Sequence, residues 1–285
     1  MKKIAVLVAC LAVSCSPVKD ASPGEPLSEA VQNIRIYALD CGRIEIDLSR
    51  FAQGDEYAGR TMNLVVGVFL IRHPQGDLMW DAGLPDAFND PENEEAKNRP
   101  DMSVPFTLAS QLEALDLAVE DIEYLSLSHS HFDHLGNANL FADSTFLVDK
   151  DERTHMFRDE ARSNANTFGA YSALEESETI QFDGDYDVFG DGTVMILAMP
   201  GHTPGHTVLQ VKLPQTGPVL LSGDLYHLKE ARERRTVPKF NTNVEDTLSS
   251  MDRFEKIAAD LGARVIVQHS MEDFQTLPKL PGYLE

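Results

Sequence analysis

The sequence predicts an α/β protein whose core is two packed β-sheets with helices on the outer faces, an αββα sandwich. Short apolar runs rich in β-branched residues recur along the chain, and helical patterns separate some of them. The strands fall into two groups, each followed by helices, which favours sheet packed on sheet with helices outside. The 285 residues are 42% hydrophobic and 25% charged, as expected of one large domain with a full core.

Nine runs have the length of a strand and are flanked by turn residues. They predict strands at Ile34–Leu39, Leu64–Ile71, Leu78–Trp80, Ile122–Leu127, Thr145–Val148, Val194–Met199, Val208–Leu213, Val219–Leu221 and Arg264–Val267. Two further segments have helical patterns. Apolar residues share one face from Val244 to Leu261, with Asn243 as N-cap and Gly262 as C-terminal cap, and a second helix is predicted over Phe106–Leu117.

The first 15 residues have the pattern of a bacterial signal peptide. Two lysines precede an apolar run over residues 4–13, which is too short to span a membrane. The segment Leu11–Cys15 resembles the bacterial lipobox, in which the cysteine is lipidated. Cys10 is a second candidate, whose preceding residues match the motif better but leave an apolar region of only six residues. Cleavage without a lipid is the third alternative.

Residues 16–33 are rich in Pro, Ser and Glu and are predicted to be a flexible tether to a single folded domain at residues 34–285. We therefore expect an exported protein of a Gram-negative bacterium, either periplasmic or a lipoprotein anchored in the outer membrane. Membrane contact would then occur only through the lipid on Cys15. Cys41 is the only cysteine of the folded domain, so no intrachain disulfide is expected.

The net charge is −22, and the acidic residues are spread along the chain. Such a surface repels phosphate backbones, which weighs against a nucleic-acid partner. The oligomeric state is left open.

The most informative stretch is His129-Ser-His131-Phe-Asp133-His134, which places four metal-binding side chains within six residues. In an extended or turning segment, His129 and His131 project to the same side, so one metal can take both. Asp133 and His134 are adjacent and diverge, so they can serve a second metal beside the first.

Other candidate ligands follow predicted strands directly. A His or Asp comes just after five of them, as Asp81, His129, His202, Asp224 and His269. Ligand sites gather on such loops because a rigid sheet holds them in place. Asp81 is expected to orient a ligand histidine rather than to bind metal, and His206 to be structural.

The order and spacing of these residues resemble the metallo-β-lactamase superfamily, and within it the N-acyl-homoserine lactone lactonases. The motifs that carry the resemblance are His129–His134, Pro200-Gly-His-Thr-Pro-Gly-His206, Asp224 and His269. The resemblance implies one metal on His129, His131 and His202, a second on Asp133, His134 and His269, and a bridge through Asp224.

A shared carboxylate offsets the repulsion of two close cations and leaves room for a metal-bridging hydroxide as the nucleophile. Nitrogen and oxygen ligands suit zinc, so two zinc ions are expected, although other divalent metals fit the same donors. The resemblance further implies a small-molecule substrate, an N-acyl-homoserine lactone, whose ring is opened in quorum quenching. Asp133 would pass a proton to the departing ring oxygen.

The alternatives are a thioesterase resembling glyoxalase II, or another hydrolase of the superfamily. A β-lactamase is disfavoured because those enzymes lack the bridging aspartate, and a non-catalytic binding protein would have little use for a complete ligand set.

The chain also departs from the lactonases at one position. They usually carry Tyr three residues after the bridging aspartate, whereas here that position is His227 and Tyr226 comes one residue early. Either side chain is a candidate for the contact to the substrate carbonyl.

Phe132 is expected in the core, although the resemblance allows it to line the pocket.

Overall fold

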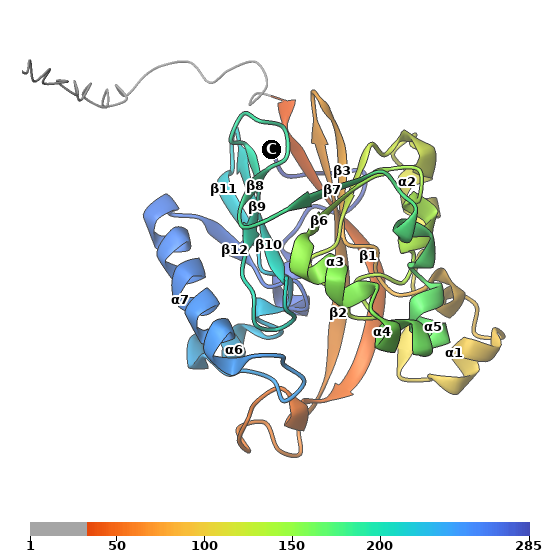
Figure 1. Cartoon of the computed structure of the whole chain (residues 1–285), viewed down its shortest axis with the longest axis vertical. Coiled ribbons are helices and arrows are strands. Elements are labelled where there is room, and N and C mark those ends of the chain that lie inside the picture. The colour runs from red at the N-terminus through yellow and green to blue at the C-terminus, as the bar shows by residue number, and fades with distance from the viewer. Residues whose placement is uncertain (1–32) are drawn as a thin grey trace, which may run out of the picture.

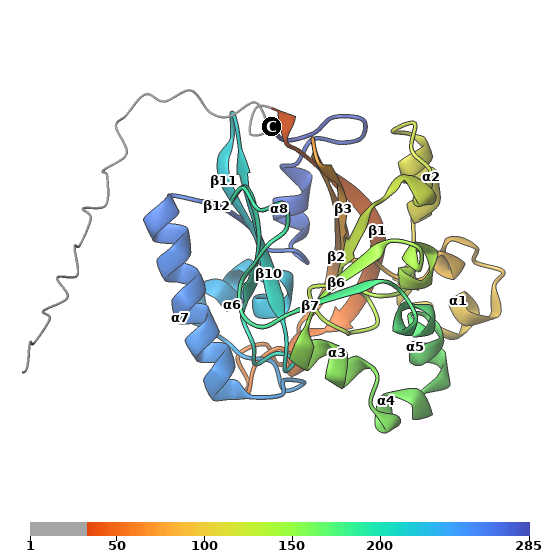
Figure 2. The same cartoon turned by 45° about the horizontal axis from the view of Figure 1, so that its top comes forward.

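The computed structural model describes residues 33–285. The predicted signal peptide, the predicted lipid at Cys15 and the tether up to residue 32 lie outside the described residues. Within the described part, two sheets pack face to face and helices cover their outer faces (Figures 1 and 2). The predicted sandwich is therefore confirmed.

The first sheet contains β1 (Arg35–Asp47), β2 (Thr61–His73), β3 (Gly76–Trp80), β4 (Met102–Ser103), β5 (Tyr124–Ser126), β6 (Thr145–Asp149) and β7 (Thr179–Phe182). Its seven strands lie in the order β4-β1-β2-β3-β5-β6-β7. The second sheet contains β8 (Tyr186–Asp187), β9 (Val194–Ala198), β10 (Thr207–Leu213), β11 (Gly217–Leu221) and β12 (Arg264–Ile266). Its five strands lie in the order β12-β11-β10-β9-β8.

All nine predicted strands are present, and the sequence patterns missed β4, β7 and β8. β4 and β8 have only two residues each, which is too short for an alternating pattern to be recognised. β7 lies at the edge of its sheet, and Ile180 and Gln181 at its centre are exposed, so it lacks a buried apolar run.

The core between the two sheets is built from the facing side chains of both. Phe69 and Trp80 of the first sheet and Leu209 of the second are fully buried in this one cluster. Dense apolar burial of this kind contributes about 1.5–3 kcal/mol per large side chain and fixes the two sheets against each other. This rigid sandwich is what holds the loops at the strand ends.

The helices are α1 (Glu94–Asn98), α2 (Leu108–Glu113), α3 (Lys150–Met156), α4 (Asp159–Ser163), α5 (Ala165–Gly169), α6 (Lys229–Arg234), α7 (Val244–Leu261) and α8 (Met271–Gln275). α7 packs on the outer face of the second sheet, and α2 to α5 lie on the side of the first (Figure 2). α7 begins and ends as predicted, because the Asn243 side chain accepts hydrogen bonds from its first turn and Gly262 ends it with φ +59°. α2 is shorter than predicted: Thr107 caps its N-terminus, and the helix ends at Glu113. Within residues 33–285, no helix has both the length and the apolar character needed to cross a bilayer.

The strand directions bring the ligand-bearing loops to one edge. β3 and β5 are parallel neighbours in the first sheet, and β11 and β12 are parallel neighbours in the second. β9 and β11 are both antiparallel to β10, so they run in the same direction as each other. The loops that follow β9, β11 and β12 therefore start from the same edge of the second sheet.

Candidate metal centre

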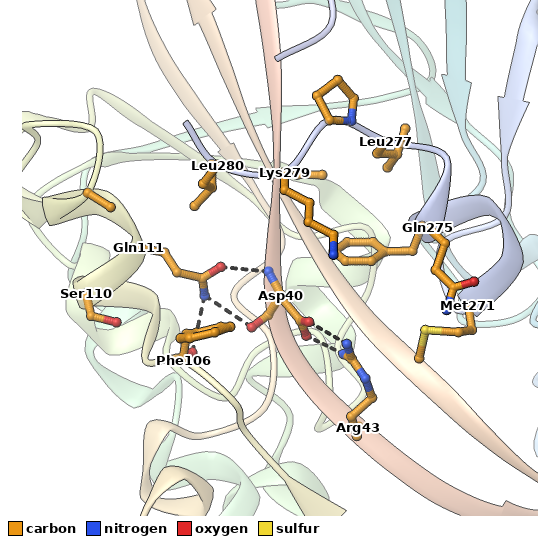
Figure 3. A pocket seen from close by; sticks show the side chains of 14 residues that line it. Asp40, Arg43, Phe106, Ser110, Gln111, Met271, Gln275, Leu277, Lys279 and Leu280 are labelled. Atoms are coloured by element: carbon orange, nitrogen blue, oxygen red, sulfur yellow. Dashed lines mark hydrogen bonds and ion pairs between the residues drawn. The ribbon is translucent and has the colours of Figure 1, made fainter. Parts of the chain in front are cut away.

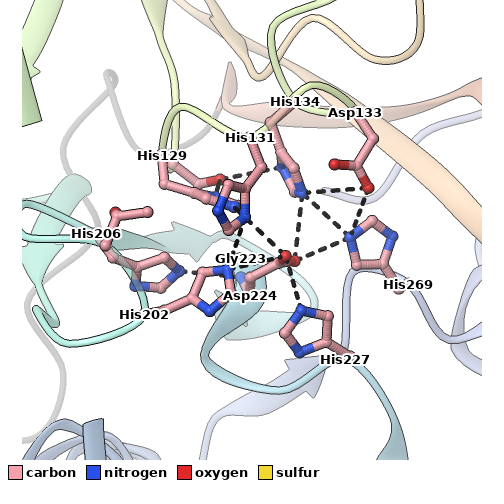
Figure 4. A network of polar contacts seen from close by, with 12 residues as sticks. His129, His131, Asp133, His134, His202, His206, Gly223, Asp224, His227 and His269 are labelled. Carbon is pink, nitrogen blue, oxygen red and sulfur yellow. Dashed lines mark hydrogen bonds and ion pairs between the residues drawn. The ribbon is translucent and has the colours of Figure 1, made fainter. Parts of the chain in front are cut away.

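The structure brings all seven predicted metal ligands together in one buried cluster (Figure 4). They form two groups, and within each group the donor atoms lie within 4.8 Å of one another. The groups are His129, His131, His202 and Asp224, and Asp133, His134 and His269. This division matches the one that the resemblance implied.

Asp224 lies between the two groups, with one carboxylate oxygen toward each. Its Oδ2 is 3.4 Å from the Nε2 atoms of both His129 and His202. Its Oδ1 is 2.9 Å from His269 Nε2 and 3.3 Å from His134 Nε2. A carboxylate in this position can bind one cation through each oxygen.

The turn after β11 sets the position of Asp224. Gly223 has φ +48°, and a Cβ there would lie 2.8 Å from His206 Nε2, so glycine is required for both reasons. The Asp224 amide donates to His206 Nε2 at 3.0 Å, and His206 Nδ1 donates to the Met199 carbonyl at 3.0 Å. Burial lowers the pKa of His206 to about 3, so its ring is neutral and can make both bonds. His206 therefore has a structural position, as expected.

Two ligand histidines are oriented through their second ring nitrogen. His134 Nδ1 donates to Asp81 Oδ2 at 2.9 Å, which places Asp81 as expected. His269 Nδ1 donates to the Val65 carbonyl of β2 at 2.8 Å. Donation from Nδ1 fixes the tautomer and leaves Nε2 with a free lone pair, which is the usual arrangement of histidines that bind metal.

These tautomers provide a test of whether the cluster suits a cation. His134 Nε2 and His269 Nε2 lie 3.1 Å apart, and in the neutral rings both carry lone pairs. Both also face Asp224 Oδ1, which accepts no hydrogen bond of proper geometry although it is fully enclosed. Lone pairs converging in a buried space repel one another unless a proton or a metal cation lies among them. The donor set therefore fits a bound metal.

The electrostatics of the ligand side chains also favour a cation. Burial lowers the pKa of His129 well below its ordinary value. Burial also acts to lower the pKa of His134, but the carboxylates of Asp224, Asp81 and Asp133 outweigh it and raise this pKa well above the ordinary value. The carboxylates thus favour positive charge on the side of the cluster that contains His134.

Of the two candidates for the substrate contact, the structure places only His227 at the cluster. His227 is buried, and its Nε2 lies 2.9 Å from Asp224 Oδ2 without a hydrogen bond of proper geometry. The Tyr226 hydroxyl instead donates to Glu255 Oε1 at 3.0 Å, and its ring packs against Phe254 of α7. The Tyr226 side chain thus points toward α7 and the His227 side chain toward the cluster, so the geometry favours His227 for the substrate contact.

Two residues that hold the centre together were not predicted. Ser128 donates its amide to Asp81 at 2.6 Å, and the Gln268 side chain donates to Asp81 and to the Gly67 carbonyl. Each directly precedes a ligand histidine, at the end of an apolar strand. A polar residue in that position was the signal available in the sequence. Phe132, expected in the core, is 41% exposed beside the cluster.

A pocket of about 540 Å³ lies elsewhere, at the edge of β1 between α2 and α8 (Figure 3). Gln111 accepts from the Asp40 amide at 2.7 Å and donates to the Asp40 carbonyl at 3.1 Å, and Asp40 forms an ion pair with Arg43. None of the seven predicted ligands lines this pocket.

Comparison with known proteins agrees with this geometry. The family model of the metallo-beta-lactamase superfamily matches residues 64–269, which include every predicted ligand. The chain belongs to the metallo-beta-lactamase superfamily.

Several of the curated relatives of this chain are named N-acyl homoserine lactonases. The N-acyl homoserine lactonase AttM of Azorhizobium caulinodans is 28% identical over 264 residues, covering 89% of this chain and 99% of that protein. The N-acyl homoserine lactonase AiiA of Bacillus thuringiensis subsp. kurstaki is 26% identical over 256 residues, covering 88% and 98%. A solved N-acyl homoserine lactone hydrolase, with N-hexanoyl-L-homoserine at its catalytic metal centre, is similar with a TM-score of 0.73 and 26% identity, covering 90% and 100%. The predicted metallo-β-lactamase fold is thereby confirmed.

Proposed function

We propose that this protein is a metal-dependent hydrolase that opens the lactone ring of N-acyl-homoserine lactones and so quenches quorum sensing. The observation that carries the proposal is the position of Asp224, with one oxygen toward each of two groups of ligand side chains. The relatives named N-acyl homoserine lactonases, which match along nearly their whole length, support the choice of substrate class.

Zinc is the metal proposed for both groups, because five imidazoles and two carboxylates suit zinc among the available divalent ions. When bound, such a pair of ions supplies Lewis acidity to the substrate oxygens and lowers the pKa of water toward neutrality. Asp81 and the Val65 carbonyl hold His134 and His269 in the tautomer that binding requires.

Asp133 and His227 are proposed to act on the substrate itself. Asp133 Oδ2 lies 3.6 Å from His269 Nε2, and its side chain is 12% exposed, so it can exchange a proton with the ring oxygen when the acyl C–O bond breaks. His227 lies on the other side of Asp224 and has an Nε2 without a hydrogen bond. A neutral imidazole there can donate to the substrate carbonyl, as the family tyrosine does.

Export and a lipid anchor on Cys15 are proposed from the sequence pattern at residues 1–15. An exported lactonase would meet its substrate outside the cytoplasm. The proposed reaction itself does not depend on where the protein is located.

Substrate comparison tests the activity. Purified protein should open N-acyl-homoserine lactones of several tail lengths with release of one proton per turnover, and acidification should re-form the lactone from the product. S-lactoylglutathione and a chromogenic cephalosporin are the controls. Cleavage of the thioester orders of magnitude faster than any lactone would replace the lactonase with a thioesterase.

A further inference from the structure

Glu152, in the first turn of α3, is a buried carboxylate that the proposed mechanism does not use. It is only 1% exposed. Among residues 33–285, no basic side chain forms an ion pair with it. A buried charge of this kind is costly unless hydrogen bonds satisfy it.

Four hydrogen bonds do so, and all come from the two loops that carry the three-histidine group. Oε1 accepts from the Ser130 amide at 2.8 Å and from the Ser130 hydroxyl at 2.6 Å. Oε2 accepts from the Thr203 hydroxyl at 2.7 Å and from the Gly205 amide at 3.0 Å. Each carboxylate oxygen thus binds one loop.

The residues bound by Glu152 are neighbours of the ligands in sequence. Ser130 lies between His129 and His131, and Thr203 directly follows His202. The loop after β9 also touches the first turn of α3, because a Cβ on Gly205 would lie 2.3 Å from the Glu152 amide nitrogen. No comparable contact links Glu152 to the group formed by Asp133, His134 and His269 among the described residues.

We propose that Glu152 is a positioning residue that joins these two loops and sets the metal affinity of the group formed by His129, His131 and His202. Without it, the loop from the first sheet and the loop from the second would hold their histidines independently. The inference rests on the proposed metal centre but not on the proposed substrate.

The test is zinc competition against a chelating indicator, made on the purified full chain. The wild-type protein should show two zinc-binding steps. His202→Ala should remove the step of the group formed by His129, His131 and His202, and His269→Ala should remove the other, which assigns each step to its group. Glu152→Gln keeps the shape but replaces one acceptor oxygen with an NH2 group, which then faces the two donors of one of the two loops. The Glu152→Gln variant should lower the zinc affinity of the step that His202→Ala removes by about 10–100-fold, and should leave the zinc affinity of the other step within about threefold of wild type.

Glu255→Gln is the control, because Glu255 accepts hydrogen bonds from Tyr226 and Arg232 and contacts neither the loop of Ser130 nor the loop of Thr203. Both zinc steps should be unchanged in it even where the free energy of unfolding falls. Equal behaviour of Glu152→Gln and Glu255→Gln would overturn the proposal and leave Glu152 a purely structural residue.

Single-hydroxyl variants cover the case in which Glu152→Gln fails to fold. Ser130→Ala and Thr203→Val each remove one of the four bonds and should weaken the same zinc step about threefold to tenfold. Unchanged zinc affinity in both variants would also overturn the proposal. A selective loss of zinc affinity in a protein whose wild type opens no lactone would sustain the role of Glu152 and contradict the proposed function alone.

Discussion

At the scale of single residues, spacing in the sequence predicted the ligand cluster well because metal binding restricts which side chains can be used. The pair His129 and His131, two residues apart, projects to one side as the pattern required. The role of residues that act through hydrogen bonds was harder to predict. Glu152 lies in the first turn of a helix, where acidic residues are common for electrostatic reasons, so nothing in the sequence marks it.

His73 is a second residue whose environment the local sequence does not predict. Its sequence neighbourhood is polar, yet the ring is buried, stacks on Phe189 at 3.9 Å and pairs with Asp191 at 3.1 Å. Both partners are more than 100 residues away along the chain, so only the folded sheets bring them together.

The adjacent residues His227 and Tyr226 give a prediction at this scale. His227→Ala should lower catalytic efficiency toward lactones about 10–1000-fold, because a donor to the developing oxyanion is lost. Tyr226→Phe should change efficiency little and reduce only stability, since its hydroxyl bonds to Glu255. Steady-state kinetics with metal content measured in parallel checks both. The reverse pattern would place the substrate contact on Tyr226.

At the scale of elements, long apolar strands and the capped helix α7 were predicted because their patterns extend over many residues. β1 and β2 run 13 residues each, well beyond the apolar runs that indicated them. Pairing between the two strands extends them through polar positions such as Glu45 and Asn63, which local composition does not predict. Tertiary pairing therefore decides where these strands end.

The junction between the loop after β9 and α7 gives a prediction for elements. Gly201 has φ +131°, and a Cβ there would lie 2.3 Å from the Thr247 amide nitrogen. Gly201→Ala should lower the free energy of unfolding by about 1–3 kcal/mol and displace His202, which weakens zinc binding. Urea unfolding and zinc competition measure the two effects.

Gly262→Ala is the control for backbone conformation. Gly262 also has a left-handed φ, +59°, but nothing lies within 4 Å of a Cβ there. The Gly262→Ala variant should lower the free energy of unfolding by about 1 kcal/mol and leave the zinc affinity unchanged. Loss of zinc affinity in Gly262→Ala as well would mean that α7, rather than the close approach at Gly201, controls the site.

At the scale of the whole molecule, the sandwich explains why ligands far apart in sequence meet. Asp81 and His129 follow strands of the first sheet, whereas His202, Asp224 and His269 follow strands of the second. The fold class and the strand ends were both predicted from sequence patterns. Together they were enough to predict that ligands from the two sheets lie close to one another. The packing that fixes the distances, such as that of the buried cluster to which Trp80 and Leu209 both belong, follows only from the folded structure.

Export is a prediction about the whole chain. The pattern at residues 1–15 predicts a mature protein that begins at a lipidated Cys15. Mass spectrometry of the membrane-associated protein from a Gram-negative host should show a diacylglyceryl group on that cysteine. Cys15→Ser should release the protein from the membrane fraction. A soluble mature protein that begins at an unmodified residue after Cys15 would exclude the anchor.

Lactone opening should require two metal ions held by the seven ligands. Zinc is titrated into protein stripped with a chelator while lactone opening is followed by proton release. Activity should be absent at the start and reach its full value at two equivalents of zinc, and Asp224→Ala should not recover. Full activity in the stripped protein, or a fully metallated and fully active Asp224→Ala variant, would contradict the account.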